Sequence, residues 1–160
     1  MWFFMNTCYI SSLLTFIVLI IGFLQSIFHF KVFEANHVTF TILASMIYLF
    51  TETLIIFFFV GTGTSVKEFT QEKKLKLDYY KTSLNIKRRI YPPQLLNILF
   101  MMILFILVGA VDTQRVPAWG YHVYYVFCLA HFLHVKKIQH FGFRENTFNI
   151  LAMSGVPAPR

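Results

Sequence analysis

An acidic residue lies inside one of the most apolar stretches of this chain. The stretch MIYLFTETLIIFFFVGTG, residues 46–63, suits a lipid environment, yet Glu52 lies almost at its middle. An isolated charge that faces lipid costs at least about 2.5–3.5 kcal/mol, so Glu52 is expected to face the interior of a helix bundle and to have a polar partner there. Ionisable residues at such positions are candidate functional sites, as proton carriers or ion ligands.

Other apolar segments carry polar residues at a similar depth. At about 1.5 Å per residue from the midpoint of each segment, Glu52 lies about 3 Å, His131 about 7–8 Å and Asn97 about 9 Å to the same side of the membrane centre. His134 follows His131 on a similar helix face. The sequence therefore predicts an intramembrane cluster of these four residues, with His131 or Asn97 as the partner of Glu52. A proton relay, a quinone-head pocket or an ion site would fit this cluster, and so would polar contacts that only hold the helices together.

Three histidines mark the opposite face of the predicted bundle. His29 ends the first apolar segment, His37 precedes the second and His122 opens the fourth, with Glu34 and Asp112 at the same level. Imidazoles from different helices can ligate haem or a transition metal, and the pattern resembles the haem b-bearing anchors of respiratory complexes, although it matches no family motif. The favoured interpretation is an aromatic belt with solvated histidines. The aromatic residues at this level are Trp119, Tyr121, Tyr124 and Tyr125.

The elements that would position these residues are transmembrane helices. Hydrophobic residues make up 57% and charged residues 13% of the 160 residues, whereas a soluble globular protein carries about 25% charged residues. Four segments, near 9–30, 38–61, 94–112 and 117–135, have about the length that a 30 Å hydrocarbon core requires. The fourth is the weakest, because it contains three histidines. The sequence predicts an all-α integral membrane protein, with a single four-helix domain over residues 1–160.

The positive charges predict the orientation of these helices. Eight Lys and Arg residues lie between the second and third segments and four follow the fourth, so 12 of the 14 lie on one side, while Lys31 and Arg115 lie on the other. The positive-inside rule then predicts that both termini, a loop over 62–93 and a tail over 136–160 are cytoplasmic. The expected location is the inner (cytoplasmic) membrane of a cell, or an organelle inner membrane. Six residues of the loop are expected to contact lipid headgroups, either from an ordinary loop or from helices lying on the bilayer: Lys73, Lys74, Lys76, Lys87, Arg88 and Arg89.

The sequence contains little that indicates catalysis. The HExxH, GxSxG and desaturase-type histidine motifs do not occur, Cys8 and Cys128 form no CxxC pair, and no nucleic-acid-binding motif accompanies the net charge of +7. The favoured hypothesis is a non-catalytic accessory or anchor subunit of a larger membrane complex in respiration or electron transfer, with the bilayer and other membrane subunits as partners. The alternatives are a haem b- or quinone-binding anchor, and an oligomeric ion- or proton-coupled transporter that uses Glu52.

Overall fold

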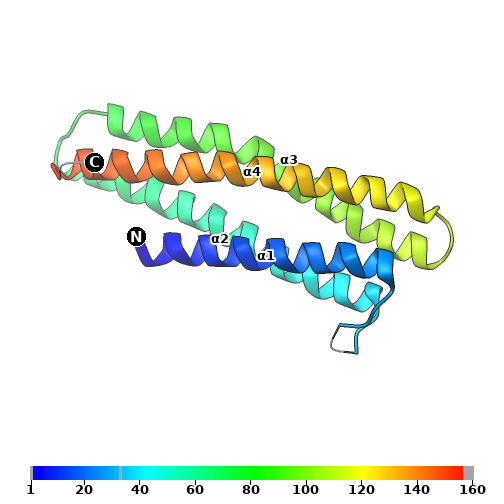
Figure 1. Ribbon diagram of the computed structural model, residues 1–160. Coiled ribbons are helices and arrows are strands. Elements are labelled where there is room, and N and C mark those ends of the chain that lie inside the picture. The colour runs from blue at the N-terminus through cyan, green and yellow to red at the C-terminus, as the bar shows by residue number, and fades with distance from the viewer. Residues whose placement is uncertain (1, 33, 157–160) are drawn as a thin grey trace.

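The computed structural model describes residues 2–32 and 34–156 and contains four long helices. They are α1 (Trp2–Phe28), α2 (His37–Glu72), α3 (Asp78–Asp112) and α4 (Ala118–Met153). Figure 1 shows an elongated antiparallel bundle in which the α1–α2 and α3–α4 connections share one end, here called the outer end. The α2–α3 turn, the start of α1 and the end of α4 lie toward the other, inner end. The all-α four-helix prediction is confirmed.

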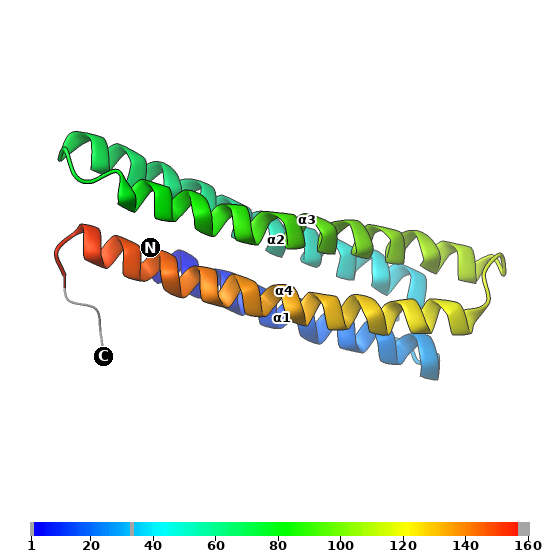
Figure 2. The ribbon, with the colours of Figure 1, turned by 90° about the horizontal axis from the view of Figure 1, so that it is seen from above.

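The four helices pack in chain order around the bundle. The most extensive packing joins α3 to α4, followed by α2 to α3 and α1 to α2, whereas α1 and α4 are in contact over a much smaller part of their length. Seen from above in Figure 2, α2 and α3 lie on one side and α1 and α4 on the other. This is the up-down-up-down order typical of four-helix bundles with short connections, and the seam between α1 and α4 is its loosest side.

Three of the described helices, α1, α2 and α3, are long and apolar enough to cross a membrane. At about 1.5 Å per residue, α2 and α4 are each about 54 Å long, well beyond the roughly 30 Å of a hydrocarbon core. By hydropathy the chain is a multi-pass membrane protein with helices that continue past the lipid. The described α4 does not reach the hydropathy of the other three.

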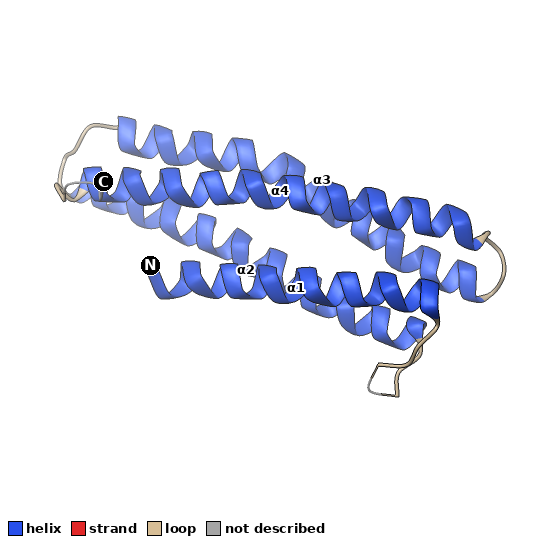
Figure 3. Ribbon diagram, in the orientation of Figure 1, coloured by secondary structure: helices blue, strands red, loops and turns tan. Residues whose placement is uncertain are grey.

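The predicted loop over 62–93 is helical for most of its length. The structure continues α2 to Glu72 and begins α3 at Asp78, which leaves only the turn at 73–77 between them. Figure 3 shows this turn as a short connection between two helices that continue the bundle. The second predicted segment ended at residue 61, whereas α2 continues through Gly63, where a Cβ would overlap the Lys87 side chain of α3. The glycine leaves room there for the end of the Lys87 side chain, and a single glycine lowers helix propensity by only about 1 kcal/mol.

The predicted tail over 136–160 is also largely helical. Helix α4 continues to Met153 in one unbroken element, and residues 157–160 of the predicted tail lie outside the described part of the chain. Together, 62–72 of α2, 78–93 of α3 and 136–153 of α4 form a helical extension at the inner end, here called the inner stalk.

Two apolar clusters fill the interior of the bundle. The outer cluster includes Leu19 of α1, Tyr48 of α2, Met101 of α3 and Phe132 of α4. The inner cluster is built from Cys8, Ile55, Phe58, Phe59, Ile86, Ile90 and Phe143. Along each of α2, α3 and α4, polar side chains in the interior lie between the two clusters. Glu52 is one of these on α2.

Candidate functional site

Glu52 is completely enclosed between the two apolar clusters. Its side chain has 0% exposure, and the Nζ of Lys136 on α4 donates a hydrogen bond to its Oε1 at 2.8 Å. The Lys136 side chain is 17% exposed, so the ammonium group lies toward the edge of the bundle while the carboxylate lies inside it. A buried ion pair of this kind requires further hydrogen bonds, because attraction between the charges alone does not offset their desolvation.

Two glutamines complete the environment of the carboxylate. The Nε2 of Gln94 on α3 donates to Glu52 Oε2 at 2.8 Å and to the Glu52 backbone carbonyl at 3.1 Å. The Nε2 of Gln139 on α4 donates to the same Oε2 at 3.0 Å, while its Oε1 accepts from Lys136 at 2.9 Å. These four residues, Glu52, Gln94, Lys136 and Gln139, are called the Glu52 network below. It connects α2 to both α3 and α4.

The predicted partner of Glu52 was wrong, since the carboxylate pairs with Lys136 and not with His131 or Asn97. The error lies in the depth estimate. At about 1.5 Å per residue, Glu52 lies about 22 Å along α2 from His37, and Lys136 about 27 Å along α4 from Ala118. In a 30 Å core that starts at these residues, Glu52 lies about midway between the centre and the inner boundary, and Lys136 lies close to that boundary. The prediction placed the midpoint of each apolar segment at one depth, whereas the packing of the helices aligns Glu52 with Gln94 and Lys136.

Asn97 and His131 are in contact with each other in a separate network. Asn97 Nδ2 donates to the hydroxyl of Tyr48 at 2.8 Å, and Asn97 Oδ1 lies 3.0 Å from His131 Nδ1. This contact lies about one helical turn outward from the Glu52 network, because Asn97 is three residues from Gln94 on α3. His134 is exposed, and its ring centroid lies 6.4 Å from that of His131. The predicted four-residue cluster is thus divided into two networks and one exposed histidine.

A small cavity reaches the Glu52 network from the seam between α1 and α4. It has a volume of about 210 Å³, and Lys136 and Gln139 form part of its wall. Tyr9 of α1 and His140 of α4 also line this cavity, and the Tyr9 hydroxyl lies 2.9 Å from His140 Nδ1. Lys136 can therefore be reached from the side of the bundle, whereas Glu52 itself is enclosed.

The outer histidines are only partly brought together. His29 and His37 line one pocket with Gln25 and Asp112. His122 does not line this pocket and packs against Phe23 and Tyr121. Within residues 2–32 and 34–156, no group of three His, Cys, Asp or Glu side chains is arranged to hold a metal ion.

The six predicted headgroup residues do not share one surface. Lys73, Lys74 and Lys76 are exposed in the turn at 73–77, and Arg88 is exposed on α3. Lys87 instead packs over Gly63 of α2, and Arg89 forms an ion pair with Glu145 of α4. Two of the six therefore stabilise contacts between the helices of the inner stalk.

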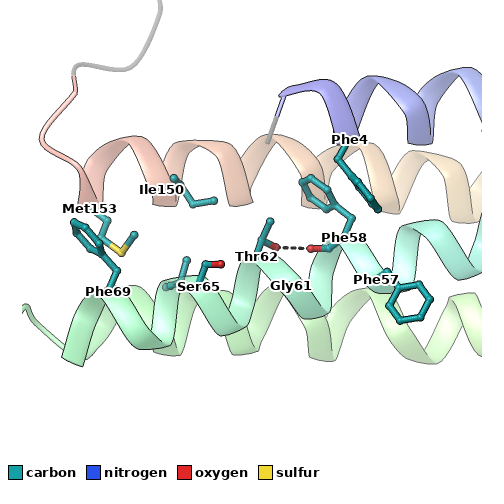
Figure 4. A pocket seen from close by; sticks show the side chains of 10 residues that line it. Phe4, Phe57, Phe58, Gly61, Thr62, Ser65, Phe69, Ile150 and Met153 are labelled. Atoms are coloured by element: carbon teal, nitrogen blue, oxygen red, sulfur yellow. Dashed lines mark hydrogen bonds between the residues drawn. The ribbon is translucent and has the colours of Figure 1, made fainter. Parts of the chain in front are cut away.

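An apolar groove of about 460 Å³ runs along the inner stalk, between α2 and the end of α4. Figure 4 shows Phe4 at one side of it and Ile150 and Met153 at the other. The hydroxyl of Thr62 in its floor donates to the Phe58 carbonyl at 2.8 Å, within α2 itself. The groove therefore presents few unsatisfied polar groups.

Sequence reasoning missed the uncharged partners in these sites. Gln25, Gln94 and Gln139 are all buried, and Lys136 was counted among the cytoplasmic cations. A glutamine inside an apolar segment is a usable signal, because its amide must find a hydrogen-bond partner in lipid.

No protein family, curated protein or solved structure matches this chain. Its function is therefore inferred from the geometry of the bundle.

Proposed function

We propose that this protein is a four-span membrane protein that acts as a non-catalytic accessory or anchor subunit of a larger membrane complex. The observation that carries the proposal is that both carboxylate oxygens of Glu52 are hydrogen-bonded. Its two carboxylate oxygens accept hydrogen bonds from Lys136, Gln94 and Gln139. Interhelical polar contacts of this kind hold membrane bundles together. A fully paired carboxylate at the junction of three helices suits a structural role, and the respiratory or electron-transfer setting is proposed on the sequence pattern alone.

The packing of α4 supports a fourth membrane span. Tyr121, Tyr125 and Phe132 of α4 belong to the outer cluster, together with residues of α1, α2 and α3. Because α4 lies along α3 over most of its length, a bilayer crossed by α1, α2 and α3 also surrounds α4. Its outward face carries apolar side chains, as lipid contact requires: Trp119, Val123, Val126, Phe127 and Leu133.

An even number of spans places both chain ends on the same side, and the basic residues of the inner stalk make that side the cytoplasm. A cysteine replacing Lys74 should then resist an impermeant thiol reagent in intact cells, while a cysteine replacing Lys31 should react. Both positions are exposed in connections between helices. Labelling at position 74 with protection at position 31 would reverse the orientation.

The subunit hypothesis is tested by native electrophoresis of the tagged protein, extracted from its own host in a mild detergent. The protein should migrate in a complex much larger than its own 18.8 kDa. Glu52→Gln should retain this complex, and Glu52→Leu should reduce it by disrupting the bundle. Migration of the parent protein only as a monomer or as a homo-oligomer would contradict the proposal.

Ion- or proton-coupled transport is the second candidate, and the cavity beside Lys136 and Gln139 favours it. A route from this cavity to Glu52 would pass through Lys136. The Glu52→Gln variant distinguishes the two functions. A structural role predicts that assembly and activity of the host complex both survive, whereas a proton-carrying role predicts normal assembly with loss of proton coupling.

A further inference from the structure

The outer end of the bundle contains a polar pocket that the proposed function does not use. It has a volume of about 260 Å³ and lies between the end of α1, the start of α2 and the end of α3. Its polar lining residues are Gln25, His29, Lys31, Asn36, His37 and Asp112. This pocket is called the outer pocket below.

Two residues of the outer pocket have buried polar atoms without partners. Gln25 is 0% exposed, and its Nε2 donates to the Ala35 carbonyl at 2.9 Å, which fixes the orientation of the amide. Its Oε1 has no hydrogen-bond partner among the described residues, and the same holds for the buried Nδ1 of His37. The other ring nitrogen of His37 lies 3.0 Å from the Tyr121 hydroxyl. Buried polar atoms are almost always hydrogen-bonded in native proteins. Tyr91 and Gln94 also have unpaired buried oxygens and line a cavity of about 120 Å³, whereas the outer pocket is larger and adds the carboxylate of Asp112 to its two unpaired atoms.

The chemistry of the pocket favours a ligand that is cationic and donates hydrogen bonds. Gln25 Oε1 can only accept, and Asp112 contributes a carboxylate that forms no ion pair with any described residue. Helices α1 and α3 both end here, so the partial negative charge of two helix C-termini adds to this carboxylate. The N-terminus of α2 contributes the opposite partial charge, and Asn36 Oδ1 caps it by accepting from the Thr39 backbone N–H at 2.9 Å.

We infer that the outer pocket binds a primary ammonium group, carried by a free amine or by the headgroup of an aminophospholipid. The N–H groups of the ammonium would donate to Gln25 Oε1 and His37 Nδ1, and its charge would face Asp112. The Lys31 side chain is 69% exposed, so its ammonium group can extend into solvent when the ligand binds. Lipid headgroups and dissolved amines both reach the outer end of a transmembrane bundle.

A thermal unfolding titration of the full chain in detergent tests this site. Ethanolamine should raise the unfolding temperature saturably, because a ligand that binds only the folded state stabilises it. Tetramethylammonium at the same ionic strength has the charge but no N–H donor, so it should have no such effect. An equal response to both cations, or no response to ethanolamine, would overturn the proposal.

Two matched variants locate the binding. Asp112→Asn should weaken the apparent ethanolamine affinity about tenfold, which is the usual effect of losing one charge-assisted hydrogen bond. Glu68→Gln removes an exposed carboxylate that forms no ion pair with a described residue and does not line the pocket, and the affinity should not change. Equal effects of the two substitutions would mean that ethanolamine responds only to the overall charge of the protein, and this would contradict the inference.

A second measurement distinguishes the two sources of the ammonium group. Native mass spectrometry of protein from micelles with equal phosphatidylethanolamine and phosphatidylcholine should show preferential retention of phosphatidylethanolamine if the ligand is a lipid, and Asp112→Asn should abolish the preference. Binding of ethanolamine without a lipid preference assigns the pocket to a free amine. Stabilisation by Zn²⁺ but not by ethanolamine would replace the inference with a metal site at His29 and His37.

Discussion

The Glu52 network lies at the middle of the bundle and the outer pocket at its outer end, and they satisfy their buried polar atoms in different ways. The oxygens of Glu52 accept from three side chains. In contrast, Gln25 Oε1 and His37 Nδ1 have no partner among the described residues. Burial of an unpaired polar atom costs about 1–3 kcal/mol. The Glu52 carboxylate avoids this cost within the bundle, although Gln94 Oε1 beside it has no partner among the described residues. The outer pocket leaves this cost for a ligand. Substitutions should therefore change the free energy of unfolding at the first site and the response to amines at the second.

The largest effect is expected from Glu52→Leu. This change leaves Lys136 as a charge without its partner and removes the acceptor of both glutamine amides, and breaking a buried pair in this way costs about 3 kcal/mol or more. Glu52→Gln keeps the shape and one acceptor but sets its NH2 group against a donor and removes the charge that faces Lys136, so it should cost about 2 kcal/mol, less than Glu52→Leu. Reversible denaturation in mixed detergent micelles measures both values. A Glu52→Leu variant as stable as the parent would mean that the carboxylate has no buried partner.

A smaller effect is expected where α4 approaches α3. A Cβ at Gly142 would overlap the Ile90 side chain and would lie 3.3 Å from the ring of Phe59. Gly142→Ala should therefore destabilise the protein by about 1–3 kcal/mol, the usual cost of overpacking a core. Gly109→Ala is the control, because nothing lies within 4 Å of a Cβ at that position of α3. If both substitutions are equally tolerated in the same denaturation assay, the close helix contact is not required.

The sequence predicts those features of the structure that follow from local patterns, and it does not predict those that depend on contacts between helices. Hydropathy and helix length dominate the fold class, so the four helices could be predicted. The cost of a charge in lipid makes Glu52 face inward, and its side chain is buried. Its partner depends on the register between helices, which no local pattern contains. The packing of 62–72 of α2 against 78–93 of α3, with Lys87 over Gly63, is likewise a tertiary effect.

Asn97→Leu should change the free energy of unfolding by a moderate amount. The change should be smaller than for the Glu52 substitutions and larger than for substitutions in the outer pocket. The change removes the donor to the buried Tyr48 hydroxyl and the acceptor beside His131. Single interhelical hydrogen bonds in membranes contribute about 0.6–1.7 kcal/mol, so a loss of about 1 kcal/mol is expected. Asn85→Leu on the exposed face of the same helix should leave the free energy of unfolding unchanged. If Asn97→Leu lowers the free energy of unfolding no more than Asn85→Leu, the contacts of Asn97 with Tyr48 and His131 do not stabilise the bundle.

The smallest effect is expected from Asp112→Asn in the absence of amines. Its side chain is exposed and forms no ion pair with a described residue, so the free energy of unfolding should change by less than about 0.5 kcal/mol. The same denaturation assay measures this value, with and without ethanolamine. A loss above 1 kcal/mol without ligand would give this end of the bundle the same structural role as the Glu52 network and would remove the contrast between them.

The most direct test is a double-mutant cycle on Glu52 and Lys136, since their pairing is the central claim. Glu52→Leu and Lys136→Met should each destabilise the bundle, because each leaves one member of a buried pair unpaired. The double variant should recover much of the loss, with a coupling energy of about 2 kcal/mol or more. Lys137→Met, at the exposed neighbouring position, should show no coupling to Glu52→Leu. Additive effects of Glu52→Leu and Lys136→Met would contradict the ion pair and, with it, the structural role proposed for Glu52.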